Sequence, residues 1–224
     1  MRTMQREPRA CAVLLATVLA AVVLASCGGS DDGAAQKTAT ATAAGLKLGP
    51  AFGSMSSLPG VLQTRPPWAD NGDQLQQRLR AIGLEPLQEE GQVVHIHQHL
   101  DLFDGGRRVT VPANIGIDPG RAFISALHTH DDSGVLHVES PTATSYTLGQ
   151  LFAVWGVRLD ARCIGGLCAR GDRRLRAWVD GKPVAADPTR IILEEHQEIV
   201  LAYGTPAQAP DPLPKSYDFA AVGL

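Results

Sequence analysis

The sequence lacks the motifs that mark several common enzyme classes. It contains no G-x-S-x-G nucleophile turn, no phosphate-binding P-loop, no G-x-G-x-x-G fingerprint and no H-E-x-x-H zinc helix. The sequence therefore gives no support for an α/β-hydrolase, a nucleotide-binding protein or a helix-based metalloprotease. The chain also has no internal repeat of fixed period, which argues against a solenoid or a propeller.

A strong charge of either sign is missing as well. The formal net charge is −3, from 20 Lys and Arg against 23 Asp and Glu. A protein that binds nucleic acid normally carries a basic patch or a clear excess of positive charge. We therefore expect no nucleic acid among the partners of this chain.

The apolar run near the N-terminus is too short to be a typical membrane helix. It extends from Ala10 to Ala25, follows Arg2, Arg6 and Arg9, and has only Thr17 as a polar interruption. About 20 apolar residues are needed to span a bilayer. A basic start, a short apolar run and small residues at its end are typical of a secretory signal.

The end of this run, Leu24-Ala25-Ser26-Cys27, resembles the lipobox of bacterial lipoproteins. The resemblance implies cleavage before Cys27 and attachment of lipid, including palmitate, to that cysteine. It places the mature protein outside the cytoplasm, on the cell membrane, or on the outer membrane if the source has two membranes. The alternative is an ordinary secretory signal with a chance cysteine.

This cleavage divides the chain into a signal peptide (1–26), a lipid anchor with a flexible tether (27–45) and a single domain (46–224). Residues 28–45 contain no large apolar side chain, so they have nothing with which to form a core. The membrane, reached through the lipid on Cys27, is the one partner that the sequence predicts.

Few cysteines remain for the domain. The chain has 4, of which one lies in the apolar run and Cys27 takes lipid, leaving Cys163 and Cys168. Exported proteins form disulfides readily, and Gly165 with Gly166 permits a tight turn between the two sulfurs. We predict a Cys163–Cys168 disulfide. The alternative, a redox or metal-binding pair, lacks the usual C-x-x-C spacing.

Period-two patterns outnumber helical ones. Helices are expected at 70–82 and 147–155, where apolar residues recur at helical spacing after a capping residue. The candidate strands are 93–103, 107–111, 123–130, 135–139, 175–179, 183–185, 191–193 and 198–203, joined mostly by hairpin turns. The pattern predicts a mainly β fold, an antiparallel sandwich or barrel with two short peripheral helices.

Histidine is concentrated in one region. The chain has 7 histidines, and all but His196 lie between residues 95 and 137. They form two His-x-His runs and one His-x-Glu pair, each on a predicted strand, where residues two apart share a face. The candidate metal ligands are His95, His97, His99, His128, His130, His137 and Glu139.

Strand geometry limits how many of these side chains can reach one ion. A rise of ~3.3 Å per residue places His95 and His99 about 13 Å apart. We therefore expect two of the first run to act with His128, His130 or His137. The remaining histidine would support a ligand, hold a second ion or carry a proton.

The ligand types narrow the choice of metal. Imidazole is the commonest protein ligand of transition metals such as zinc, copper, iron and nickel. No cysteine lies in this segment and Met55 is the only methionine after the signal, which disfavours Cu(I). We predict Zn, Cu(II) or Fe, with Mn and Ni also compatible. Carboxylates are available from Asp101, Asp131, Asp132 and Glu139.

The segment also resembles a His-rich domain of uncharacterised secreted bacterial proteins. The runs that carry the resemblance are HIHQHLDLF, VPANIGI, ALHTHDDSGVLHVESP and YTLGQLFAVWG. It extends over most of the chain from Trp68 onward and implies no particular activity. His128-x-His130 followed by His137-x-Glu139 is only weakly similar to the metal motif of cupins, since the spacing differs and the glycine framework is missing.

Two functions remain open. The first is a membrane-tethered extracytoplasmic lipoprotein that binds a transition metal through its histidines, either as a binding protein or as a metalloenzyme. The second is a metal-free binding module of the cell envelope, with a histidine-lined cleft that responds to pH.

Overall fold

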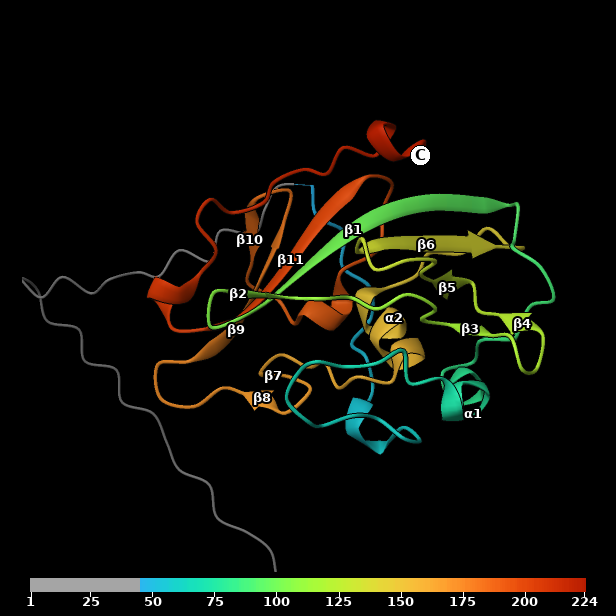
Figure 1. Cartoon of the computed structure of the whole chain (residues 1–224), viewed down its shortest axis with the longest axis horizontal. Coiled ribbons are helices and arrows are strands. Elements are labelled where there is room, and N and C mark those ends of the chain that lie inside the picture. The colour runs from blue at the N-terminus through green and yellow to red at the C-terminus, as the bar shows by residue number, and fades with distance from the viewer. Residues whose placement is uncertain (1–44) are drawn as a thin grey trace, which may run out of the picture. The chain divides into compact units, whose positions relative to one another are not determined.

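The computed structural model describes residues 45–224, which belong to one compact unit (Figure 1). The predicted signal peptide, Cys27 and the predicted tether up to residue 44 lie outside the described residues. The helices are η1 (Met55–Ser57), η2 (Gly72–Gln74), α1 (Leu75–Ala81), α2 (Leu148–Trp155), η3 (Pro188–Arg190), η4 (Pro206–Gln208) and η5 (Ala220–Val222).

The strands are β1 (Val94–Asp104), β2 (Arg107–Val109), β3 (Ile117–Asp118), β4 (Phe123–Ile124), β5 (Leu127–His128), β6 (Val135–Ser140), β7 (Cys163–Ile164), β8 (Leu167–Cys168), β9 (Arg174–Val179), β10 (Lys182–Val184) and β11 (Gln197–Gly204). Seven of them form one sheet in the order β10-β9-β11-β1-β6-β5, with β2 paired to the far end of β1. The pairs β3–β4 and β7–β8 form two small hairpins.

The central strand β1 has two different faces. Leu100 and Leu102 are 1% exposed and point into the core, together with Leu136 of β6 and Ile199 of β11. The odd-numbered residues of β1 point to the opposite face and are polar from His95 to Asp101. The alternation of the sequence therefore separates an apolar core face from a polar face on the same strand.

Helix α2 fills the core beneath the sheet. Thr147 begins it with a capping box, in which the Thr147 side chain accepts from the backbone N–H of Gln150 and the Gln150 side chain accepts from that of Thr147. Gly156, at φ 76°, ends it. Leu151, Phe152 and the other apolar side chains of this helix are completely buried.

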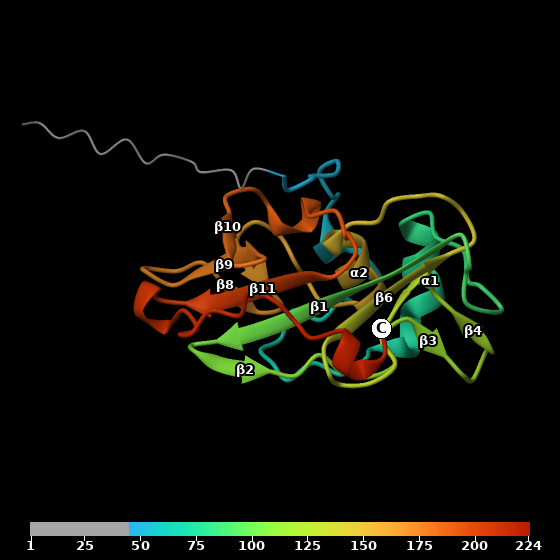
Figure 2. The ribbon, with the colours of Figure 1, turned by 90° about the horizontal axis from the view of Figure 1, so that it is seen from above.

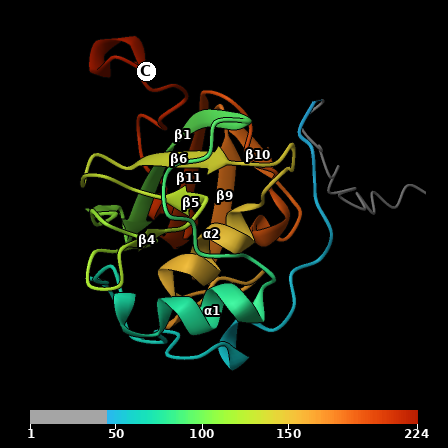
Figure 3. The same ribbon diagram turned by 90° about the vertical axis from the view of Figure 1, so that its right-hand side faces the viewer.

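Residues 45–224 are arranged in layers on either side of the large sheet. Helices α1 and α2 lie on one side of the sheet, and the C-terminal segment with η5 lies on the other side (Figures 1 and 3). Seen from above, that segment lies over the β1–β6 side of the sheet (Figure 2). The polar face of β1 is thus partly covered by the end of the chain.

The predicted class, mainly β with two short helices, is confirmed. The large sheet does not close into a barrel, because its end strands β10 and β5 do not pair with each other. It is mixed, because β1 and β11 run parallel while the other pairs are antiparallel. Of the two helices, α2 lies inside the core instead of at the periphery, since its apolar residues cover most of its surface. Predicted strand 123–130 is split into β4 and β5, and 191–193 makes only isolated bridges at Ile191 and Ile192.

Candidate metal centre

The ladder between β1 and β6 aligns the first His-x-His run with the His-x-Glu pair. His95 lies opposite Glu139, and His97 lies opposite His137. Directly opposite residues in an antiparallel pair share a face and have Cβ atoms about 4.5–5.5 Å apart. The rings of His97 and His137 accordingly lie 4.7 Å apart, edge to face.

Strand β5 adds the second His-x-His run on the other side of β6. His128 lies opposite His137, with the two rings stacked and their centroids 5.2 Å apart. His130 follows just beyond the end of β5, and its ring centroid is 4.5 Å from that of His137. Three strands therefore bring together side chains that lie more than 40 residues apart in the sequence.

The side chains meet around one carboxylate. In one group, four residues each offer a ligand atom within 4.8 Å of the others, and a second group of three shares Glu139 with it. We call the combined set the Glu139 cluster. Its members are His95, His97, His128, His130, His137 and Glu139.

The orientation of His128 is fixed by a backbone carbonyl. Its Nδ1 donates to the carbonyl oxygen of Ser125 at 3.0 Å, so the neutral ring has its lone pair on Nε2. That Nε2 faces Nε2 of His130 at 3.2 Å. Two ligands of a tetrahedral ion with bonds of 2.0–2.1 Å lie about 3.4 Å apart. A ring held through one nitrogen by a backbone carbonyl, with the other nitrogen turned towards further ligands, is the usual setting of a metal ligand.

Glu139 lies at the centre of the cluster. Its Oε1 is 3.0 Å from Nδ1 of His137, 3.4 Å from Nε2 of His95 and 3.9 Å from Nε2 of His128. Its Oε2 is buried and has no hydrogen-bond partner within residues 45–224. Burial, and the negative charge of Glu90 nearby, raise the pKa of Glu139.

His97 contributes a second orphaned atom. The residue is 6% exposed, and its Nε2 is buried without a hydrogen-bond partner in the described part of the chain. A buried polar atom without a partner costs about 1–3 kcal/mol. Two such atoms in one cluster of ligands fit a site that a cation completes.

His97, His128 and His137 are held in their neutral form. Burial, with the neighbouring His130, lowers the pKa of His128 to about 4. Burial, with His128 and His130, lowers the pKa of His137 to about 3. Burial and the neighbouring His95 also lower the pKa of His97. Lone pairs are therefore available to a metal at neutral pH.

His99 lies apart from the Glu139 cluster. Its Nε2 donates to the carbonyl oxygen of Ser133 at 3.0 Å, and its Nδ1 is 2.8 Å from Oε2 of Glu198. The ring of Tyr217 stacks on it at 4.0 Å. His99, Asp101 and Glu198 form a third group of close ligand atoms, but both nitrogens of His99 are already engaged by the protein.

Two buried carboxylates complete this second polar group. Arg108 pairs with Asp101 through both of its terminal nitrogens. Burial disfavours the imidazolium of His99, but the hydrogen bond and charge of Glu198 and the charge of Asp101 outweigh it and raise the pKa of His99. Of the predicted ligands, the structure therefore brings six together and separates His99 from them.

The remaining candidates have other surroundings. Asp131 accepts from the backbone N–H of Ser133 in an exposed turn, and Asp132 is exposed. His196, which lies outside the histidine-rich segment of the sequence, is exposed, pairs with Glu195 at 2.9 Å and stacks on Phe219. Glu198 was missed by sequence reasoning, because only the parallel pairing of β11 with β1 brings it beside His99.

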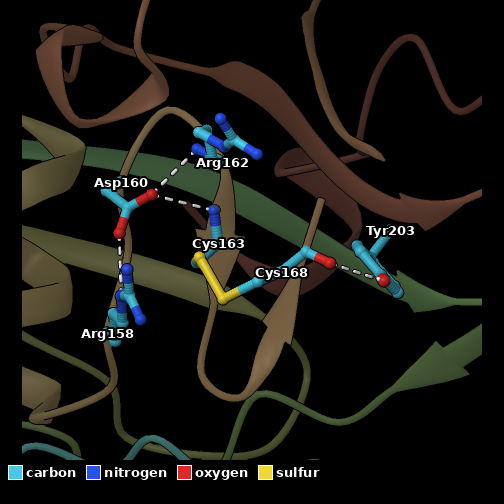
Figure 4. The surroundings of a disulfide bond; sticks show 6 residues. All are labelled: Arg158, Asp160, Arg162, Cys163, Cys168 and Tyr203. Carbon is cyan, nitrogen blue, oxygen red and sulfur yellow. Dashed lines mark hydrogen bonds and ion pairs between the residues drawn. A yellow bond between two sulfur atoms is a disulfide. The ribbon is translucent and has the colours of Figure 1, made fainter. Parts of the chain in front are cut away.

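The predicted disulfide is present at Cys163 and Cys168, which face each other across the β7–β8 hairpin (Figure 4). Asp160 accepts from the backbone N–H of Cys163 and from Nε of Arg158. The hydroxyl of Tyr203 donates to the carbonyl oxygen of Cys168 at 2.9 Å. The bridge thus leaves no free thiol in residues 45–224 for a metal.

No family model, curated protein or solved structure matches the chain. Within residues 45–224, no helix has the length and apolar character needed to cross a membrane.

Proposed function

We propose that this chain is a membrane-tethered extracytoplasmic lipoprotein that binds a transition metal ion at the Glu139 cluster. One observation carries the metal site. His128, His130, His137 and Glu139 each offer a ligand atom, and these four atoms lie within 4.8 Å of one another. Three imidazoles and one carboxylate form a donor set that suits a transition metal.

The electrostatics of the cluster support the same conclusion. Without a cation, Nε2 of His97 and Oε2 of Glu139 are buried and have no hydrogen-bond partner within residues 45–224. A cation bound at the cluster would stabilise the ionised form of Glu139. Because the pKa of His128 is lowered to about 4, its ring needs no deprotonation before it binds a metal at pH 7.

The donor set favours Zn, Cu(II) or Fe. Imidazole nitrogen suits all three, whereas Cu(I) prefers thiolate and thioether ligands. Met55 is buried in the hydrophobic core and the two described cysteines form a disulfide. Among the described residues, no thiol or thioether is therefore available to a metal at the Glu139 cluster.

Metal analysis of the full chain tests the binding site. Protein purified from membranes in detergent is loaded with Zn(II), desalted and analysed for bound metal. We expect at least one ion per chain and a clear loss in His130→Ala. His196→Ala is the matched control, because it removes an exposed histidine outside the cluster. Metal that is substoichiometric, or unaffected by His130→Ala, would overturn the proposal.

The alternative function has a different signature. A metal-free envelope module would show no change in thermal stability on addition of chelator, together with a clear loss of stability or binding between pH 7 and pH 5. That combined result would favour the histidine-lined, pH-sensitive cleft over the metal site.

The lipid anchor is a separate part of the proposal. The lipobox-like Leu24–Cys27 supports it, and the Cys163–Cys168 bridge fits an exported protein. Mass spectrometry of the mature N-terminus should find lipid, including palmitate, on Cys27. The variant Cys27→Ser should leave the membrane fraction. An unmodified Cys27 or an uncut signal in the wild-type chain would contradict the anchor and leave the metal site standing.

A further inference from the structure

We infer that the Glu139 cluster holds two metal ions side by side, with Glu139 as the carboxylate that bridges them. The inference rests on the proposed function, since it concerns the same cluster. It adds the number of ions, the ligands of each and the position that is left open to solution.

The ligand atoms fall into two groups that share a single residue. His128, His130 and His137 form one group with Glu139, whereas His95 and His97 form the other with the same carboxylate. The two groups do not join into a single set of ligand atoms within 4.8 Å of one another. An ion centred in one group therefore leaves the histidines of the other group without an occupant.

The topology explains why the groups are separate. The run of His95 and His97 belongs to β1, and the run of His128 and His130 begins in β5, with β6 between these strands. Neighbouring strands are about 4.8 Å apart, so β1 and β5 are about 10 Å apart at the backbone. Each His-x-His run reaches inward over β6, where Glu139 is placed to meet both.

One oxygen of Glu139 faces both sides of the cluster, and the other has no partner. Oε1 lies 3.4 Å from Nε2 of His95 and 3.9 Å from Nε2 of His128, so it already faces histidines from both strands. Oε2 is buried without a partner in residues 45–224. Two-metal sites have their ions about 3.5–4 Å apart, which is a separation that the two oxygens of a single carboxylate can span.

Further negative charge lies at both ends of the cluster. Oε1 of Glu90 is 3.4 Å from Nε2 of His130, at the β5 end. Oε1 of Glu195 accepts from the backbone N–H of His97 at 3.4 Å, at the β1 end. Two nearby cations repel each other, and a carboxylate beyond each ion reduces that repulsion.

The two positions differ in their number of ligands. The first position has four protein ligands, which is the closed arrangement of a structural site, and it includes the completely buried His128. The second position has three, which leaves a place for water or substrate. Exposure does not separate the two positions, because His95 in the second and His130 in the first have side chains that are each 45% exposed. The number of ligands does, so the second ion is the one with an open position and the weaker binding.

Titration of the metal-free full chain with Zn(II) in detergent measures the number of ions. We expect two ions per chain in isothermal titration calorimetry and native mass spectrometry. The double variant His95→Ala/His97→Ala should retain one ion, bound with the higher affinity of the wild-type pair. His196→Ala should retain two. Loading with Cu(II) should give an electron paramagnetic resonance spectrum that is coupled in the wild type and resembles an isolated ion in the double variant.

The number of bound ions separates failure of the proposed metal binding from failure of the two-ion centre. No bound metal in the wild type would refute the proposed function itself. One ion would leave that function intact and refute the two-ion centre. Two ions that show no magnetic coupling, and that Glu139→Gln leaves unchanged in affinity, would refute the bridge. Circular dichroism of each variant separates loss of ligands from loss of fold.

Discussion

The Nε2 atoms of His128 and His130 face each other at 3.2 Å. Nδ1 of His128 donates to the carbonyl oxygen of Ser125, which leaves Nε2 of the neutral ring as an acceptor. Two facing lone pairs repel each other unless a proton or a cation lies between them. This pair of atoms is therefore a sensitive reporter of what occupies the Glu139 cluster.

The first prediction concerns stability with and without metal. Zn(II) should raise the thermal unfolding temperature, and excess chelator should lower it again. A ligand that binds only the folded state at 100 times its Kd stabilises it by about 2.7 kcal/mol. Differential scanning fluorimetry measures the shift, which should shrink strongly in His130→Ala and stay unchanged in His196→Ala. An equal shift in His130→Ala would show that the metal binds elsewhere.

The second prediction concerns the pH dependence of the metal-free protein. Burial and the neighbouring imidazoles lower the pKa of His128 to about 4, below the ordinary value of 6.5. The unfolded chain then binds more protons than the folded chain below pH 6.5, so stability is complete above that pH and is lost as the pH falls towards 4. His128 alone contributes about 3 kcal/mol to this loss.

Urea unfolding in the presence of chelator, at intervals from pH 7.5 to pH 4, measures this effect. His128→Gln should flatten the decline, because glutamine does not titrate. His196→Gln should leave the decline as in the wild type. A wild-type stability that stays constant between pH 6.5 and pH 4.5 would contradict the pKa shift.

The third prediction concerns the buried pair of His99 and Glu198. The side chains are 5% and 1% exposed, and their atoms lie 2.8 Å apart. The removal of one partner of a buried ion pair costs about 3–5 kcal/mol, so Glu198→Ala should lose stability on this scale. Metal stoichiometry should stay as in the wild type, since both nitrogens of His99 already have protein partners.

The stability contributed by His99 depends on pH in the opposite sense to that of His128. The pKa of His99 is raised, so its contribution is complete below the unfolded value of 6.5 and is lost as the pH rises through the folded value. Unfolding of the wild type and of His99→Gln at pH 6 and pH 9 should therefore differ more at pH 6. A larger difference at pH 9 would indicate that His99 is neutral in the folded protein.

Much of the candidate site could be predicted from local sequence pattern. The alternation in β1 places His95 and His97 on one face, and the same rule places His137 beside Glu139. The hairpin that joins β5 and β6 is also a local feature. The meeting of the two histidine runs is not local, because it needs the pairing of β1 with β6 that places His97 opposite His137.

The surroundings of His99 depend on a contact that leaves no local signal. Strand β11 pairs in parallel with β1 and comes from a part of the chain about one hundred residues further on. Parallel neighbours are joined by long connections, so neither the position of Glu198 nor its distance from His99 follows from spacing. The burial of α2 has a similar origin, since the open sheet needs an apolar layer on one face.

The fourth prediction concerns Arg78, a completely buried arginine of α1 whose side chain reaches the last turn of α2. Its Nε donates to the carbonyl oxygen of Ala153 at 3.0 Å, and one Nη donates to those of Val154 at 3.1 Å and Asn71 at 2.5 Å. The last carbonyls of a helix have no partner inside the helix, and positive charge is favourable there. Burial lowers the pKa of Arg78 to about 10, so the guanidinium is charged at neutral pH at some cost.

Two opposing effects decide the outcome of Arg78→Met. Loss of the charge relieves a burial cost of about 3 kcal/mol. Loss of four hydrogen bonds from a charged donor, the fourth to the carbonyl oxygen of Pro59 at 3.4 Å, removes about 1.5–3 kcal/mol each. The hydrogen bonds are the larger sum, so we expect a net loss of at least about 3 kcal/mol in urea unfolding. Arg78→Lys keeps the charge with fewer donors, so its stability should lie between those of Arg78→Met and the wild type.

Because Arg78 lies with α2 on the core side of the sheet, Zn(II) stoichiometry should be the same in folded Arg78→Lys as in the wild type. A stability of Arg78→Met equal to that of the wild type would show that the burial cost cancels the carbonyl contacts.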